Sequence, residues 1–101
     1  MNRDQAIRAL RAHEQEFRAA GVVSVSLFGS VARGESSTHD VDVVVRLGRN
    51  FSEPGFDYFS RMDELEERLA TILGCTVDVV EEPVRKERFQ QEIDRDRALA
   101  F

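Results

Sequence analysis

The sequence lacks long apolar runs and has a single cysteine, Cys75. One cysteine cannot form an internal disulfide, and it excludes a zinc knuckle or a CxxC redox motif. The first twenty residues lack the apolar core of about seven residues that a signal peptide needs, and no stretch approaches the roughly 18 apolar residues of a membrane span. We therefore expect a cytoplasmic protein with no membrane partner.

An excess of basic residues is also absent. The 101 residues contain 14 Lys and Arg against 19 Asp and Glu, a formal net charge of −5. Tight binding to a nucleic-acid backbone needs a positive surface, so DNA is not an expected partner. A chain of this length is expected to form one domain over residues 1–101.

Hydrophobic periodicity and turn signals predict an α/β (α+β) fold with the order α-β-α-β-α-β-α. The Asn2–Gln5 pair can cap the first helix, which is expected to run to Gly21. The expected strands cover residues 22–28, 41–45 and 76–80. The later helical segments are expected at 31–33, 56–73 and 84–96, with a short apolar tail at 98–101.

The connections predict a small three-stranded mixed sheet flanked by helices. In the first strand Val23, Val25 and Leu27 are expected to face inward, and Ser24 and Ser26 outward. Its link to the second strand is short, which permits antiparallel pairing. Roughly thirty residues with a long helix join the second and third strands, as parallel neighbours require.

Two aspartates, Asp40 and Asp42, flank Val41 at the start of the second strand. Side chains alternate along a strand, so both point to one face, about 6.6 Å apart along the backbone at ~3.3 Å per residue. A divalent cation such as Mg²⁺ relieves the repulsion and desolvation of such a pair. A cap or turn role for Asp40, with Asp42 in solvent, is the alternative for this motif alone.

Asp78 favours the metal-site interpretation, because its context in residues 77–80 (VDVV) nearly repeats that of Asp42 in residues 41–45 (VDVVV). The two strands are expected to be neighbours. Three carboxylates are enough to hold the two metal ions of a phosphoryl-transfer site, which lie roughly 3.5–4 Å apart. We therefore expect Asp40, Asp42 and Asp78 to be catalytic residues that bind two Mg²⁺ ions.

The Gly29-Ser30 turn after the first strand would supply the phosphate-binding half of the site. Glycine lets the backbone approach phosphate closely, and the Ser30 hydroxyl and free N–H groups of the next turn bind anionic oxygens. An ordinary tight turn is the alternative for this pair alone. Residues 29–36 have Walker A spacing, but Glu35 stands where the lysine must be, which excludes that motif.

The run GSVARGESSTHDVDVVV (residues 29–45) resembles the GSxARGxxxxSDxDxxV signature of the nucleotidyltransferase superfamily that includes DNA polymerase beta. The later VDVV resembles the third acid of that superfamily. Length and element order resemble in particular the minimal nucleotidyltransferase (MNT) antitoxins, which are encoded beside HEPN-domain toxins. One departure is His39, because the superfamily usually has serine just before the first acid.

This resemblance implies an Mg²⁺-dependent enzyme that transfers AMP from ATP to a tyrosine of a HEPN ribonuclease toxin, its partner in a hetero-oligomer, and thereby acts as an antitoxin. It implies that Gly29 and Ser30 bind the nucleotide phosphates, and that Asp78 completes the metal site and helps to activate the acceptor hydroxyl. Arg33 is assigned to nucleotide binding, with pairing to Glu35 or another surface acid as the alternative.

Two other functions fit the same residues. A nucleotidyltransferase could act on a small molecule or an RNA end, although the short chain leaves little to hold such an acceptor and the net charge does not favour RNA. A non-catalytic antitoxin could neutralise its partner by binding alone, with the acids retained for metal-stabilised folding.

Overall fold

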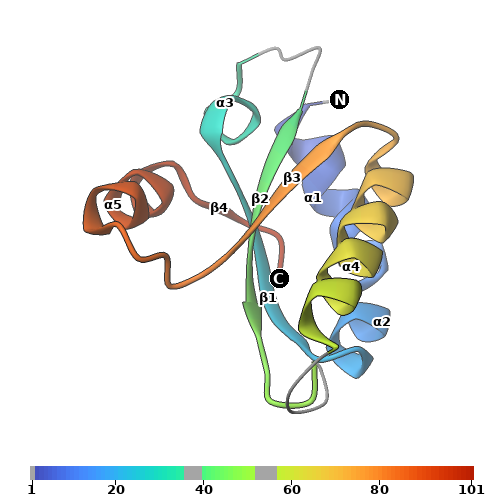
Figure 1. Cartoon of the computed structure of the whole chain (residues 1–101). Coiled ribbons are helices and arrows are strands. Elements are labelled where there is room, and N and C mark those ends of the chain that lie inside the picture. The colour runs from blue at the N-terminus through green and yellow to red at the C-terminus, as the bar shows by residue number, and fades with distance from the viewer. Residues whose placement is uncertain (1, 36–39, 52–56) are drawn as a thin grey trace.

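The computed structural model describes residues 2–35, 40–51 and 57–101. In these residues the chain forms five helices and four strands (Figure 1). In chain order they are α1 (Arg3–Ala12), α2 (Glu14–Ala19), β1 (Val22–Phe28), α3 (Gly29–Ala32), β2 (Val41–Leu47), α4 (Tyr58–Leu73), β3 (Val77–Glu81), α5 (Glu87–Asp96) and β4 (Ala98–Leu99). None of the helices in the described ranges is long and apolar enough to cross a bilayer.

The strands form one mixed sheet in the order β3-β2-β1-β4. As predicted, β1 and β2 are antiparallel and β2 and β3 are parallel. The sheet has four strands, so the predicted number of three was wrong. The extra strand, β4, comes from the apolar tail, and it pairs antiparallel with β1 through Ser26–Leu99 and Leu27–Ala98.

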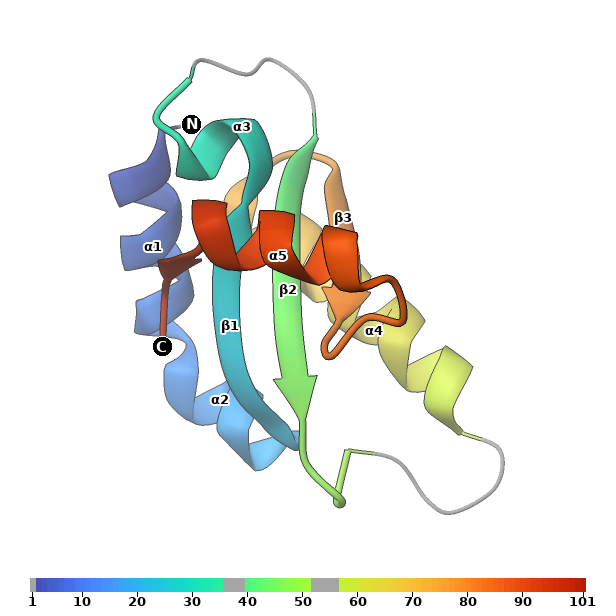
Figure 2. The same cartoon turned by 90° about the vertical axis from the view of Figure 1, so that its left-hand side faces the viewer.

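Helices cover the two faces of the sheet unequally (Figures 1 and 2). The long helix α4 lies on one face with α1 and α2, whereas α5 crosses the strands on the other face. The short helix α3 lies beyond the end of β1, next to the start of β2. One face is therefore covered by a layer of three helices, and the other is covered only in part, by α5.

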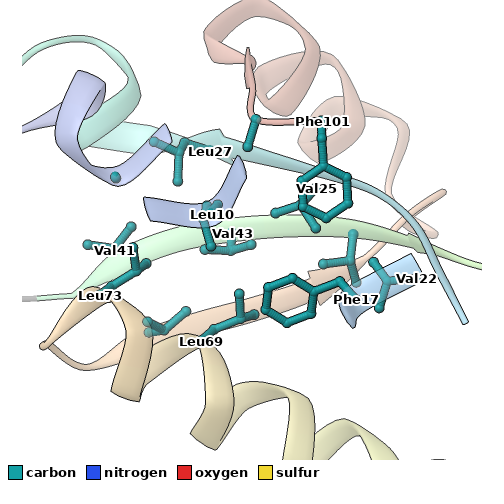
Figure 3. Packing of buried hydrophobic residues seen from close by; sticks show 14 of the residues in the cluster. Leu10, Phe17, Val22, Val25, Leu27, Val41, Val43, Leu69, Leu73 and Phe101 are labelled. Carbon is teal, nitrogen blue, oxygen red and sulfur yellow. The ribbon is translucent and has the colours of Figure 1, made fainter. Parts of the chain in front are cut away.

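The main core lies between the sheet and the layer of α1, α2 and α4 (Figure 3). Leu10, Phe17 and Leu69 from three helices meet Val25 and Val43 from the central strands, and each is at most 1% exposed. Burying one such side chain is worth about 1.5–3 kcal/mol. A second, smaller cluster joins Phe28, Val44 and Ile93 under α5.

The first helix begins as predicted but is interrupted. The backbone N–H of Gln5 donates to Asn2 Oδ1 at 2.8 Å and that of Asn2 to Gln5 Oε1 at 3.0 Å, so the capping box is confirmed. At His13 the backbone leaves the helical region (φ −111°, ψ 14°), which divides the predicted helix into α1 and α2. Apolar periodicity continues across this break, so the sequence pattern alone did not reveal it.

The predicted inward face of β1 was wrong at one end. Val22 pairs with Leu47 and Ser24 with Arg46, so two residue steps on β1 match one on β2, and Val23 is an extra residue. Such a bulge turns its residue out of the alternation, and Val23 is 47% exposed. Ser26, which was expected to face solvent, is 1% exposed on the α5 side of the sheet.

A buried carboxylate ties α5 to that side of the sheet. The side chain of Glu82 is 0% exposed and accepts hydrogen bonds from Arg97 at 2.5 and 2.8 Å and from Gln90 at 3.0 Å. Arg97 also donates to Ser26 Oγ at 3.3 Å. These hydrogen bonds, with that from Arg97 the strongest, hold the pKa of Glu82 below its usual value despite burial.

A carboxyl group whose pKa is lowered by folding stabilises the folded state at pH values above its unfolded-state pKa, which is about 4.3 for Glu. This stabilisation is lost as the pH falls through the folded-state pKa. We expect Glu82→Gln to lower the free energy of unfolding by about 3 kcal/mol at pH 7, because it breaks a buried ion pair. In denaturant titrations the difference from wild type should shrink below about pH 4. Glu92→Gln, on the exposed surface of α5, is the control. A difference that does not change with pH would contradict this assignment.

Candidate active site

The pairing of β2 with β3 places two of the predicted acids side by side. Asp42 and Asp78 are direct partners in the parallel register, and neighbouring strands lie about 4.8 Å apart. Asp42 and Asp78 each lie two positions before a valine that packs under α5, Val44 and Val80, so they occupy that same face of the sheet. Asp42 is half-buried and Asp78 is exposed. Asp40, two residues before Asp42, is exposed at the start of β2.

The electrostatics of the site centre on Asp42. Burial is the main cause that raises its pKa, and the charges of Asp78 and Asp40 raise it further, whereas Arg33 acts in the opposite direction. The pKa of Asp42 therefore depends on the charges of both other acids. The ionised form of this carboxylate is held in an environment that disfavours negative charge.

The backbone of Gly29 packs tightly against this carboxylate. It has φ +72°, and a Cβ atom at this position would lie 2.4 Å from Asp42 Oδ2. Only glycine combines this left-handed backbone with such a contact at little cost. The turn that ends β1 is therefore packed directly against the side chain of Asp42.

Ser30 follows Gly29 in α3 and is half-buried. The helix lasts one turn, with the backbone N–H of Arg33 donating to Gly29 O at 3.1 Å. It was predicted at residues 31–33 and begins two residues earlier. The first residues of a helix have N–H groups without partners in the helix, and α3 begins at Gly29, so its first turn lies at the end of β1 beside Asp42.

Arg33 forms ion pairs with carboxylates, which was the alternative to phosphate binding. Its Nε donates to Glu35 Oε2 at 2.6 Å and its Nη1 to Asp96 Oδ2 at 2.8 Å. Glu35 lies two residues away in the chain, but Asp96 comes from α5. Sequence reasoning missed Asp96, because the two residues are 63 positions apart and no motif marks the second.

The described carboxylates do not form a closed metal cage. Among residues 2–35, 40–51 and 57–101, no three side chains of His, Cys, Asp or Glu converge closely enough to enclose an ion. The three predicted acids instead line an open end of the sheet, two on β2 and its start and one on β3. His39, the residue that departs from the motif, lies outside the described residues.

Comparison with known proteins identifies the family. The nucleotidyltransferase domain family matches residues 7–99. A protein adenylyltransferase, MntA, of Thermococcus cleftensis is 40% identical over 73 residues, which are 70% of this chain and 68% of the relative. A protein of Methanocaldococcus jannaschii, assigned as a protein adenylyltransferase, is 43% identical over 60 residues, 58% of this chain and only 56% of that relative.

Solved structures share the fold. One, described as a minimal nucleotidyltransferase, matches 97% of this chain and 95% of its own with a TM-score of 0.73 and 29% identity. A Shewanella oneidensis MNT antitoxin, solved with a tri-AMPylated HEPN toxin, matches 94% of this chain and 71% of that chain with a TM-score of 0.61 and 17% identity. With its sequence matched from residue 7 to residue 99, the chain belongs to the nucleotidyltransferase domain family.

Proposed function

We propose that this protein is an Mg²⁺-dependent protein adenylyltransferase that transfers AMP from ATP to a tyrosine hydroxyl of a HEPN-domain toxin and so acts as its antitoxin. The observation that carries the proposal is the packing of Asp42 between Gly29 and Asp78. This half-buried carboxylate has the charges of Asp78 and Asp40 near it, and the first turn of α3, which begins at Gly29, packs against it. A cation and an anionic phosphate together complement such a site.

The donor set fits Mg²⁺. Asp40, Asp42 and Asp78 present only carboxylate oxygens, the hard ligands that this ion prefers. The raised pKa of Asp42 reflects burial first and the repulsion of Asp78 and Asp40 second, and the charge of a divalent cation would offset both. When bound, Mg²⁺ supplies charge neutralisation for the triphosphate and for the pyrophosphate that leaves. The open arrangement of the acids leaves room for the phosphate oxygens that usually complete magnesium coordination.

The reaction needs the acceptor oxygen to form a bond to the α-phosphorus as the bond to pyrophosphate breaks. The residues 29–30 turn would hold the phosphates through its N–H groups and the Ser30 hydroxyl. Asp78, the exposed member of the strand pair, is the carboxylate open to an incoming hydroxyl and would accept its proton. Asp40 and Asp42 would remain ionised as metal ligands.

The partner assignment is supported by the relatives. The Thermococcus cleftensis relative, 40% identical, is named as a protein adenylyltransferase. The Shewanella antitoxin that shares the fold is bound to an AMPylated HEPN toxin, and another toxin–antitoxin structure with this fold, with a TM-score of 0.64 and 20% identity, holds the ATP analogue AMP-PNP.

The experiment is the intact mass of the HEPN protein encoded nearest to this gene, after co-expression with this chain. We expect increments of one or more AMP units on the partner, which peptide mapping should assign to tyrosine. An unmodified partner that co-purifies and is still neutralised would replace this proposal with inhibition by binding. A partner that is neither modified nor bound would direct the search to RNA ends or small molecules.

We expect Asp42→Asn to reduce AMP transfer by at least about 100-fold, because an amide is a poor ligand for Mg²⁺. The same variant should melt at a higher temperature than wild type in EDTA at pH 7. The reason is that the raised pKa of Asp42 makes its ionised form unfavourable in the folded state, and this cost disappears at low pH when the carboxyl protonates. The intact mass of the partner measures AMP transfer, and differential scanning fluorimetry with and without Mg²⁺ measures the melting temperature. A variant that keeps its activity, or that Mg²⁺ stabilises as much as wild type, would contradict the metal assignment.

Gly29→Ala tests the close approach to Asp42, and Gly74→Ala is its matched control. Both glycines have similar backbone angles, φ +72° and +70°, so either alanine costs about 1–2 kcal/mol of strain. Only at Gly29 would the Cβ displace Asp42 Oδ2, since a Cβ at Gly74 meets nothing within 4 Å. We expect both variants to fold and only Gly29→Ala to lose transfer activity. Equal activity in the two variants would refute the contact.

A further inference from the structure

Arg33 and Asp96 join two helices that are far apart in the sequence. The Asp96 side chain, on the last residue of α5, is only 8% exposed and accepts a 2.8 Å hydrogen bond from Arg33, the residue that ends α3. The two helices lie close together in Figure 2, with α3 above the C-terminal part of α5. A carboxylate so little exposed requires a partner, and Arg33 supplies the shorter of its two described ion pairs; the other, from Arg95, is 3.4 Å long.

The helix on the Asp96 side of this contact is firmly held. Ile93 is fully buried against the sheet, and Arg97, directly after the helix, binds the buried Glu82. Asp96 lies between these two anchors. Its carboxylate is therefore held in a fixed position relative to the sheet, whereas the side chain of Glu35 is 56% exposed.

The helix on the Arg33 side needs such a contact. A four-residue helix has no stability of its own, because its one turn does not offset the cost of nucleation. Its apolar residues Val31 and Ala32 are buried in the core, and Arg3 reaches Ala32 O at 3.5 Å. On the side toward α5, the ion pair between Arg33 and Asp96 holds α3 in place.

We propose that Asp96 is a positioning residue for nucleotide binding. By holding Arg33 it fixes α3, and with α3 the Gly29-Ser30 turn, at the distance from Asp42 that the bound phosphates require. This inference rests on the proposed function. The helix α5 carries no sequence motif, but through the Asp96–Arg33 ion pair it would help to order the nucleotide site.

The matched control is Asp94, two residues away on the same helix. Asp94 is exposed and binds Arg97 at 2.8 Å, on the side of α5 that carries the Glu82 network. Asp96→Asn and Asp94→Asn each remove one negative charge from α5. Only the first removes the anchor of α3, so a general effect of charge or helix stability would appear in both variants.

We would measure the dissociation constant of Mg²⁺-AMP-PNP by calorimetry, and KM for ATP and kcat in AMP transfer, for both variants. Asp96→Asn should raise the dissociation constant and KM about tenfold, the loss of roughly one charge-assisted hydrogen bond, with kcat within about twofold of wild type. Asp96→Glu should restore much of the loss. In an Arg33→Ala background, Asp96→Asn should add less than about twofold, because the pair acts as one unit.

Different results would overturn the positioning role of Asp96 and the proposed function. Equal effects of Asp96→Asn and Asp94→Asn, or additive effects of Asp96→Asn and Arg33→Ala, would overturn the positioning role while leaving the proposed function intact. Wild-type protein that does not bind Mg²⁺-AMP-PNP would overturn the proposed function itself. If Asp96→Asn does not fold, Arg33→Lys keeps the charge but loses the planar fork, and it should raise KM in the same way. A wild-type KM in a folded Arg33→Lys would then overturn the inference.

Discussion

The parallel pairing of β2 with β3 brings two carboxylates together on one face of the sheet, where their charges repel each other. The parallel register makes Asp42 and Asp78 direct partners, and alternation then turns both toward the face that α5 only partly covers. A sheet with both faces buried could not contain this pair. Because α5 covers only part of this face and α3 lies beyond the end of β1, Asp42 stays half-buried and Asp78 exposed.

Two carboxylates on the α5 side of the sheet, those of Glu82 and Asp42, have different surroundings. Toward the end of β3, Glu82 is fully buried and its charge is matched by Arg97 within the protein. Toward the start of β2 and β3, the charge of Asp42 has no such partner in the described chain except the distant influence of Arg33. The first arrangement is complete and holds α5 in place. The second is incomplete, which is typical of a site that a ligand completes.

Much of the fold could be predicted because it depends on local patterns. The Asn2–Gln5 capping box, the alternating strands and the connection lengths give the element order, and they also give the mixed pairing that brings the acids together. The errors arise where tertiary contacts decide. Val23 turns outward at a bulge, and the apolar tail adds β4 because it can complete the edge of β1. Of the contacts around the site, that of Arg33 with Asp96 was invisible, since α5 carries no motif and only folding brings it to α3.

We propose that the Asp42 carboxylate and its neighbours form a cation site that ATP completes. Titration with Mn²⁺ as a paramagnetic substitute for Mg²⁺, followed by electron paramagnetic resonance with and without AMP-PNP, tests this most directly. We expect about two Mn²⁺ ions to bind per chain when the analogue is present, as in two-metal phosphoryl transfer, and Asp42→Asn to abolish this binding. Wild-type protein that takes up no Mn²⁺ with AMP-PNP, or an Asp42→Asn variant that binds as well as wild type, would contradict it.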